Sequence, residues 1–241
     1  MLKLIRLELT KNKLTTYLMA VLCIFVTCLG FSFLFGFIPL IESVDGVIPK
    51  DMEKFQRWGG FISLVSILYA MSFGILSAVM HTKFTVEEYT GKSAVLLFSY
   101  PQSRSKILFA KCSLVFCFTA VSMFVCNVIS VLIFSFFSNI FTILSEQFNS
   151  SFFLTLLSIS GVCSLLAASI GLIAMRVGFW KKSLIATVVT AVILIVPFSN
   201  ALSYLPEYSG TIHLVGMVVL LVIGLFIVMG LMRKVNKMEC V

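Results

Sequence analysis

The chain has 241 residues, of which 60% are hydrophobic and only 12% are charged, and its formal net charge is +8. A soluble domain has roughly 45–50% apolar and about 25% charged residues, so this composition excludes an ordinary soluble protein. The basic residues form no long run, which argues against binding of nucleic acid. We therefore expect a single membrane domain over residues 1–241, in contact with lipid and with no nucleic acid.

The chain begins with a basic stretch, residues 1–13, in which Leu2, Ile5 and Leu9 share one helical face. Other leucines interrupt its polar face, but the pattern favours an interfacial helix that lies on the membrane. The apolar run that follows is too long for a secretory signal and has no small-residue cleavage site. We expect this run to be retained as a membrane helix.

Six apolar segments are each long enough to cross a hydrocarbon core about 30 Å thick as a helix. They cover approximately residues 14–40, 60–80, 107–137, 152–175, 183–205 and 211–232. We expect no Asp, Glu, Lys or Arg in their interiors, where each such charge costs about 2.5–3.5 kcal/mol. The third segment exceeds a perpendicular span, so we expect it to tilt or to begin in the cytoplasm. The predicted fold is an all-α membrane protein with six transmembrane helices.

Lysine and arginine in the connecting segments predict the orientation, because cytoplasmic loops are enriched in them. Fifteen of the 18 fall in the N-terminal stretch, the second and fourth connections and the C-terminal tail, whereas Lys50, Lys54 and Arg57 fall in the first connection. This distribution predicts that both termini are cytoplasmic, which requires an even number of spans. It also places residues 41–58 outside the cell as a loop and residues 81–106 in the cytoplasm.

Small residues recur at every fourth position along the second and fourth segments. The two ridges consist of Ser66, Ala70, Gly74 and Ala78, and of Ser160, Ser164 and Ala168. Such ridges let two helices approach closely, either within one subunit or between two subunits.

Cysteines and prolines give weaker signals. No C-x-x-C spacing occurs, and we interpret the six cysteines of the apolar segments as small buried hydrophobic residues without a redox or metal-binding role. They are Cys23, Cys28, Cys112, Cys117, Cys126 and Cys163. Pro197 and Pro206 bracket the outer end of the fifth segment, which leaves open a broken or re-entrant stretch or a simple helix end.

One segment points to a specific function. Residues 87–111 read EEYTGKSAVLLFSYPQSRSKILFAK. Glu87, Glu88 and Tyr89 can begin a short helix that has residues 94–98 as its apolar side and ends before Pro101. Ser103 can cap the next helix, which predicts a short helix lying across the cytoplasmic face.

This pattern resembles the type-2 ABC exporter permease family, the membrane halves of ATP-driven exporters. That family has, between its second and third helices, Glu, two residues, Gly-Thr, a leucine pair, Pro, one residue, Ser-Arg and a later Lys. The matching positions are Glu88, Gly91, Leu96, Leu97, Pro101, Ser103, Arg104 and Lys111, and Lys92 stands where the family usually has Thr.

The resemblance implies that this helix docks into a cleft on a separate ATPase subunit. The coupling residues it implies are Glu87, Glu88, Tyr89, Gly91, Leu96, Leu97, Pro101 and Arg104. The carboxylates can pair with Arg or Lys of a partner. The alternatives are solvated loop charges for Glu87 and Glu88 and a membrane-face anchor for Arg104.

No catalytic or cofactor site is expected in the chain itself. Gly91, Lys92 and Ser93 end like a phosphate-binding loop, but Val86 stands where that loop requires Gly. His81 and His213 fall at opposite membrane faces in the predicted topology. The resemblance implies a non-catalytic subunit whose partner ATPase subunits bind ATP and Mg²⁺, and which pairs with a second, identical or similar, permease subunit.

The implied function is export across the cell membrane. Because the predicted spans have no charge, a pathway between two such chains would suit a peptide or another amphipathic compound. Small permeases of this type are similar to those of lantibiotic and bacitracin self-protection and of toxin-peptide export, so we expect antimicrobial resistance or peptide transport. One alternative is an ATPase-independent secondary transporter or channel, for which Asn127 is the only strongly polar interior candidate. Another is a membrane sensor or scaffold that uses residues 41–58 for recognition.

Overall fold

The computed structural model describes residues 14–41, 57–86, 104–141, 149–181, 183–202 and 210–236. In these residues the chain is helical throughout, with no β-strand. The elements are α2 (Leu14–Ile41), α3 (Trp58–His81), the π-helical turn η2 (Thr82–Val86), α6 (Arg104–Phe141), α7 (Ser150–Lys181), α8 (Leu184–Leu202) and α9 (Gly210–Asn236). One α-helix covers most of each of the six predicted apolar segments, which confirms the all-α prediction.

Four helical stretches are long and apolar enough to cross a membrane. They are Thr15–Ile38, Trp58–Val86, Ile107–Phe141 and Ser150–Lys181, and the apolar parts described for α8 and α9 are shorter, Leu184–Pro197 and Val218–Arg233. The length of α6, 38 residues, corresponds to about 57 Å at 1.5 Å per residue, well beyond a 30 Å core. The chain is thus a multi-pass membrane protein, and its third predicted segment is long, as expected.

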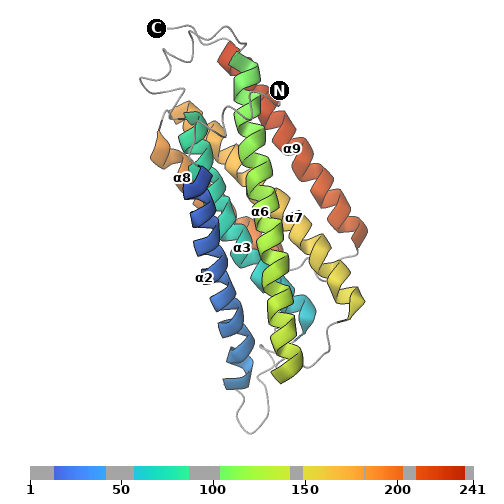
Figure 1. The fold of residues 1–241 in the computed structure, drawn as a ribbon. Coiled ribbons are helices and arrows are strands. Elements are labelled where there is room, and N and C mark those ends of the chain that lie inside the picture. The colour runs from blue at the N-terminus through green and yellow to red at the C-terminus, as the bar shows by residue number, and fades with distance from the viewer. Residues whose placement is uncertain are drawn as a thin grey trace.

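Successive helices alternate in direction, so the beginning of α2 and the end of α9 lie at the same end of the bundle (Figure 1). We call this end the basic end, because eight of the nine Lys and Arg of the described residues belong to it. They are Lys83, Arg104, Lys106, Lys111, Arg176, Lys181, Arg233 and Lys234, and Arg57 alone belongs to the other end. No Asp or Glu occurs anywhere in the described residues.

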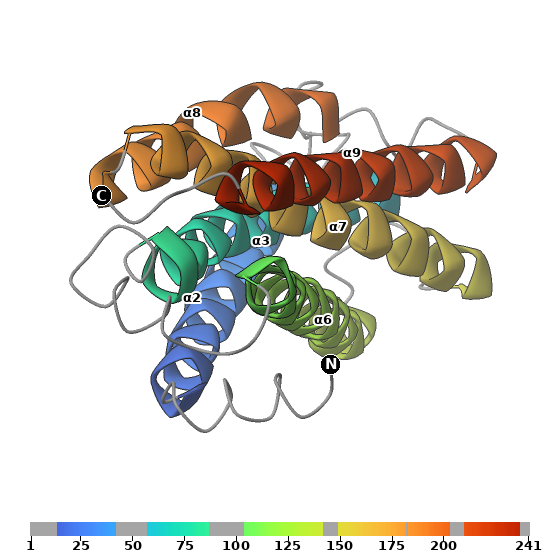
Figure 2. The ribbon, with the colours of Figure 1, turned by 90° about the horizontal axis from the view of Figure 1, so that it is seen from above.

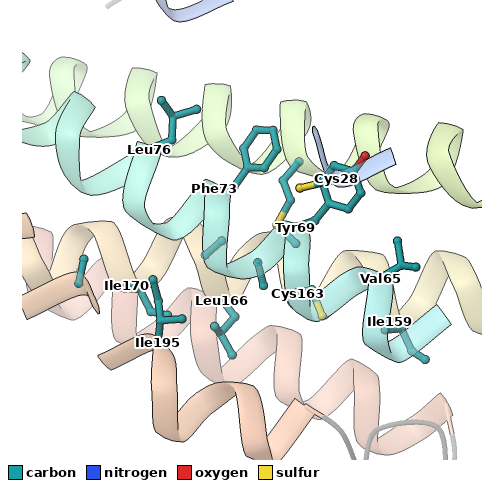
Figure 3. Close-up of a cluster of buried hydrophobic side chains, with 14 of the residues drawn as sticks. Cys28, Val65, Tyr69, Phe73, Leu76, Ile159, Cys163, Leu166, Ile170 and Ile195 are labelled. Atoms are coloured by element: carbon teal, nitrogen blue, oxygen red, sulfur yellow. The ribbon is translucent and has the colours of Figure 1, made fainter. Parts of the chain in front are cut away.

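α7 lies at the centre of the bundle. It packs against α3, α6, α8 and α9, and Figure 2 shows α8 and α9 on one side of it and α2 and α6 on the other. Figure 3 shows part of the core on both sides of α3: Tyr69, Phe73 and Leu76 point toward α6 and toward Cys28 of α2. On the other side of α3 lie Ile159, Cys163, Leu166 and Ile170 of α7 and Ile195 of α8.

The two predicted ridges of small residues are buried inside this one chain. All their members are buried: Ser66, Ala70, Gly74, Ala78, Ser160, Ser164 and Ala168. A glycine of α7 allows an even closer approach, because a Cβ at Gly171 would overlap the side chain of Ser77 on α3. The ridges therefore hold helices of one subunit together.

A buried amide joins three helices near the middle of α6. Asn127 is fully buried, and its Nδ2 donates hydrogen bonds to Ser66 Oγ of α3 at 2.8 Å and to Ser160 Oγ of α7 at 2.9 Å. His81 and Lys111 are also fully buried. Both lie toward the basic end of the bundle, at helix positions that the sequence assigned to a membrane face, so their burial does not bear on the prediction of Asn127 as the polar candidate at mid-membrane.

Two of the six cysteines were assigned wrongly as buried. Cys28, Cys112 and Cys163 are buried, whereas Cys23 and Cys117 are exposed on the outer surface of the bundle. A thiol behaves as a small apolar group, so a membrane helix accommodates it on its outer face as well as inside.

Two helix ends flank the loop predicted over residues 41–58. α2 ends at Ile41. α3 begins at Trp58, which is fully buried and packs edge-on against Phe61 and Phe134. Residues 42–56 of this loop lie outside the described residues. α8 continues through Pro197 to Leu202, so the chain is not broken up to that point. Pro206 lies outside the described residues, as does the interfacial helix predicted over residues 1–13.

Candidate coupling site

Most of the predicted coupling residues lie outside the described residues. These are Glu87, Glu88, Tyr89, Gly91, Leu96, Leu97 and Pro101. Arg104 is the first residue of α6, directly after the predicted cap residue Ser103, and only its backbone is described. The structure does describe the two helical ends that flank the segment, and these ends form the candidate site.

The first flank is η2, which continues α3 as a π-helical turn. A single π-helical turn accommodates an extra residue in a helix and is frequent at functional positions. Thr82, Phe84, Thr85 and Val86 are buried and Lys83 is exposed. The turn therefore lies in the protein core although it directly precedes the segment with the exporter-like motif.

The ring of Phe84 and the hydroxyl of Thr82 fix this turn. The Phe84 ring packs against Tyr17 of α2 with 5.3 Å between ring centroids. Thr82 Oγ1 donates a hydrogen bond of 2.7 Å to the carbonyl oxygen of Ala78, one turn earlier in α3. The turn is thus attached both to α3 and to α2.

A buried lysine of the second flank reaches the first. Lys111 lies two turns into α6 and is fully buried, and its Nζ donates a hydrogen bond of 3.2 Å to the carbonyl oxygen of Phe84. A buried ammonium group is costly unless it is paired or hydrogen-bonded. The sequence counted Lys111 with the cytoplasmic connection and placed it just inside the third helix. The structure places it two turns into α6 and adds a buried position, where a backbone carbonyl stabilises its ammonium group.

Val86, the last residue of η2, attaches the site to α7. It belongs to an apolar cluster that includes Leu108 and Cys112 of α6 and Met175 and Phe179 of α7. A Cβ at Gly178 of α7 would lie 3.4 Å from Val86 Cγ2 and would overlap Thr187 Oγ1 of α8. Gly178 therefore lets η2, α7 and α8 meet closely at this point.

This arrangement is suited to transmitting movement. Val86 on one flank and Ile107 on the other are both buried, and the bond from Lys111 to Phe84 joins the two flanks. A displacement applied to the intervening residues would act on α3 and α6 together, and through Val86 on α7. In the described part of the chain, no group of three or more His, Cys, Asp or Glu could hold a metal ion.

Two features of this site were not predicted from the sequence. The hydrogen bond of Lys111 and the burial of η2 depend on how α3, α6 and α7 pack, and neither leaves a periodic pattern. The available signal was a lysine inside an otherwise apolar stretch, since a charge at such a position commonly has a specific partner.

Comparison with known proteins gives a family match. A family profile with the description "ABC-2 family transporter protein" matches residues 4–197. The chain is also 26% identical over 199 residues to the uncharacterized protein YcbO of Bacillus subtilis (strain 168), which covers 82% of this chain and 83% of that protein. No solved structure gives a significant match.

Proposed function

Because the chain belongs to the ABC-2 family of transporter proteins, it is the membrane permease component of an ABC transporter, and we propose that this transporter is an exporter. The permease component is not itself catalytic, and the family implies partner ATPase subunits. We place ATP and Mg²⁺ in those partners. The proposal extends to a second permease subunit, identical or similar, that completes the pathway.

The proposed topology has six transmembrane helices with both termini in the cytoplasm. The alternating helices and the collection of eight basic residues at one end support it, since cytoplasmic ends of membrane proteins are enriched in Lys and Arg. In this topology the basic end, and with it residues 87–103, faces the cytoplasm. An epitope inserted after Gly91 should be labelled only in opened cells, and labelling of intact cells would refute the orientation.

The proposed coupling element consists of residues 87–104, with Glu88 and Glu87 pairing with basic residues of the ATPase. The observation that carries this proposal is the hydrogen bond from Lys111 to Phe84, because it fastens both flanks of the element to the core. Tyr89, Gly91, Leu96, Leu97, Pro101 and Arg104 complete the proposed contact. Movement of the ATPase would then reach α3 and α6 together.

A charge reversal tests the contact with the ATPase. In Glu88→Arg we expect substrate-stimulated ATP hydrolysis by the purified complex to fall at least about tenfold, because loss of a charge-assisted pair and the new repulsion together exceed about 1.4 kcal/mol. The matched control is Glu146→Arg, in the connection after α6, which should leave hydrolysis unchanged. Equal activity of Glu88→Arg and the native complex would refute the contact, and transport by the chain without any ATPase would refute the exporter.

A second variant tests the fastening of the two flanks. Lys111→Met keeps the length and the apolar stem of the side chain but removes the hydrogen bond to Phe84. We expect the ATPase subunits to remain bound, because residues 87–104 are intact. Stimulation of hydrolysis by substrate should fall about tenfold or more, because one hydrogen bond from a charged donor, worth about 1.5 kcal/mol or more, is lost. Lys83→Met, an exposed lysine of the same turn, is the control. If the control variant loses as much stimulation as Lys111→Met, the hydrogen bond does not contribute to coupling.

The proposed substrate is an antimicrobial or toxin peptide or another amphipathic compound, and the proposed role is resistance or peptide export in the cell membrane. The absence of Asp and Glu from the described helices supports a substrate that needs no acidic partner. Deletion of the gene should lower the inhibitory concentration of bacitracin or of a lantibiotic. Unchanged sensitivity to a panel of such peptides would contradict this assignment without affecting the family.

A further inference from the structure

The ends of α7 and α9 enclose a cleft at the basic end of the bundle. The cleft has a volume of about 400 Å³ and is lined by Arg176, Val177, Trp180, Gly230 and Leu231. Ligand sites in proteins typically measure roughly 300–1,000 Å³. The cleft is therefore large enough for a small polar group with part of an apolar chain.

The guanidinium group of Arg176 lies in this cleft against α9. Its Nη1 atom is 3.5 Å and its Cζ atom 3.7 Å from the position that a Cβ would take at Gly230. Because Gly230 has no side chain, the guanidinium can lie over the backbone of α9 and still remain exposed. No Asp or Glu among the described residues can neutralise its charge.

The surroundings of Arg176 suit the interface between lipid and water. Trp180, one turn further along α7, has 76% of its surface exposed, and an indole ring is preferred at the level of lipid headgroups. Arg233 lies one turn after Gly230 and is also exposed. The cleft thus combines positive charge with an aromatic side chain at the end of a membrane-spanning helix.

We propose that this cleft binds the phosphodiester group of an anionic phospholipid from the leaflet at the basic end. The planar guanidinium of Arg176 matches two oxygens of a phosphate, while Val177 and Leu231 offer apolar contact to the glycerol and the upper acyl chain. A zwitterionic lipid fits less well, because the described residues have no carboxylate for its ammonium group. The described residues that line the cleft do not belong to the coupling element, and lipid binding there needs no ATPase.

Native mass spectrometry of the full chain, or of its complex, during titration with phosphatidylglycerol or phosphatidylcholine tests the site. We expect phosphatidylglycerol to bind more tightly, and Arg176→Gln to weaken its binding about tenfold, the loss of a bidentate charge-assisted contact. The control is Lys181→Gln, an exposed lysine of the same helix that does not line the cleft, which should change binding by less than about twofold because its charge is screened.

A second pair of variants tests the shape of the cleft without changing charge. Gly230→Leu should fill the cleft and weaken binding of phosphatidylglycerol as much as Arg176→Gln does, whereas Gly216→Leu, where a Cβ has no neighbour within 4 Å, should not. Inorganic phosphate at millimolar concentration should not displace the lipid. Three results would each overturn the proposal: equal binding of the two lipids, a loss of binding in Lys181→Gln as large as in Arg176→Gln, or native binding of phosphatidylglycerol by Gly230→Leu. Displacement of the lipid by inorganic phosphate would instead show that the cleft binds a soluble anion.

Discussion

α7 and α2 are both long apolar helices, but they occupy opposite environments. In an apolar stretch of 18 residues in each helix, 72% of the α7 residues are buried inside the protein, compared with 11% of the α2 residues. Along α2 only one line of residues, Cys28, Ser32 and Gly36, is buried among those whose side chains are described. α7 contacts four other helices, whereas α2 lies at the edge of the bundle (Figure 2).

The difference does not come from hydrophobicity, since lipid is as apolar as a protein core. Helices in a membrane associate where small side chains let their backbones approach and where hydroxyl and amide groups find partners. α7 has Gly171 and Gly178 at its closest contacts and Ser160 in a hydrogen bond with α6. α2 exposes large side chains such as Leu22 and Leu34. Small residues, more than apolar ones, therefore distinguish the central helix from the peripheral one.

The largest expected effect comes from a side chain at Gly171. A Cβ there would overlap Ser77 and lie 3.1 Å from His81 Cδ2 on α3. Gly171→Leu should therefore force α3 and α7 apart, at a cost of about 3 kcal/mol or more. The measurement is the unfolding midpoint of the purified chain in mild detergent.

The matched control for Gly171 is Gly30 on α2, where a Cβ would meet nothing within 4 Å. Gly30→Leu introduces the same side chain on a peripheral helix and should change the free energy of unfolding by less than about 0.5 kcal/mol. Strong destabilisation by Gly30→Leu would show that another subunit covers α2, and the contrast between the helices would then hold for the single chain only.

A smaller effect is expected from truncation of one leucine in each helix. Leu156 of α7 is fully buried, so Leu156→Ala should leave a cavity and cost about 2–3 kcal/mol. Leu22 of α2 has 56% of its surface exposed, and Leu22→Ala should cost less than about 0.5 kcal/mol. Equal losses in the unfolding free energy would remove the distinction between central and peripheral helices.

The six helices were predictable from the sequence because a membrane span needs about 20 apolar residues, and this requirement is local. The ridge of Ser66, Ala70 and Gly74 was predictable for the same reason, since its period lies within one helix. Which partner the ridge faces was not predictable, because Gly74 meets Ile195 of α8 and Ser66 meets Asn127 of α6, and both partners are far away in the chain.

The candidate site was predictable only in part. The motif of residues 87–104 can be read along the chain, but the contact between Lys111 and Phe84 joins two helices across that segment. A lysine near the start of a membrane helix normally extends to the interface, so the sequence alone did not predict the burial of Lys111. Only the packing of η2 against α6 places its ammonium group inside the protein.

The smallest of the expected effects concerns the amide at the centre of the bundle. Asn127→Leu removes the hydrogen bonds to Ser66 and Ser160, and hydrogen bonds between membrane helices contribute only about 0.6 kcal/mol on average. Asn127 Oδ1 has no hydrogen-bond partner in the described part of the chain, so the substitution also removes a buried acceptor that is costly to leave unpaired. We expect a net loss of about 1 kcal/mol or less.

The control for Asn127 is Thr27→Val on α2, where the exposed hydroxyl bonds only to carbonyl oxygens of its own helix in the described structure. It should leave the unfolding midpoint unchanged. The comparison with Gly171→Leu then separates two explanations for the central position of α7. If Asn127→Leu costs less, close packing of small residues holds the centre of the bundle together; if it costs more, the polar contact does, and the small residues serve mainly to bring Ser66 and Ser160 within reach of the amide.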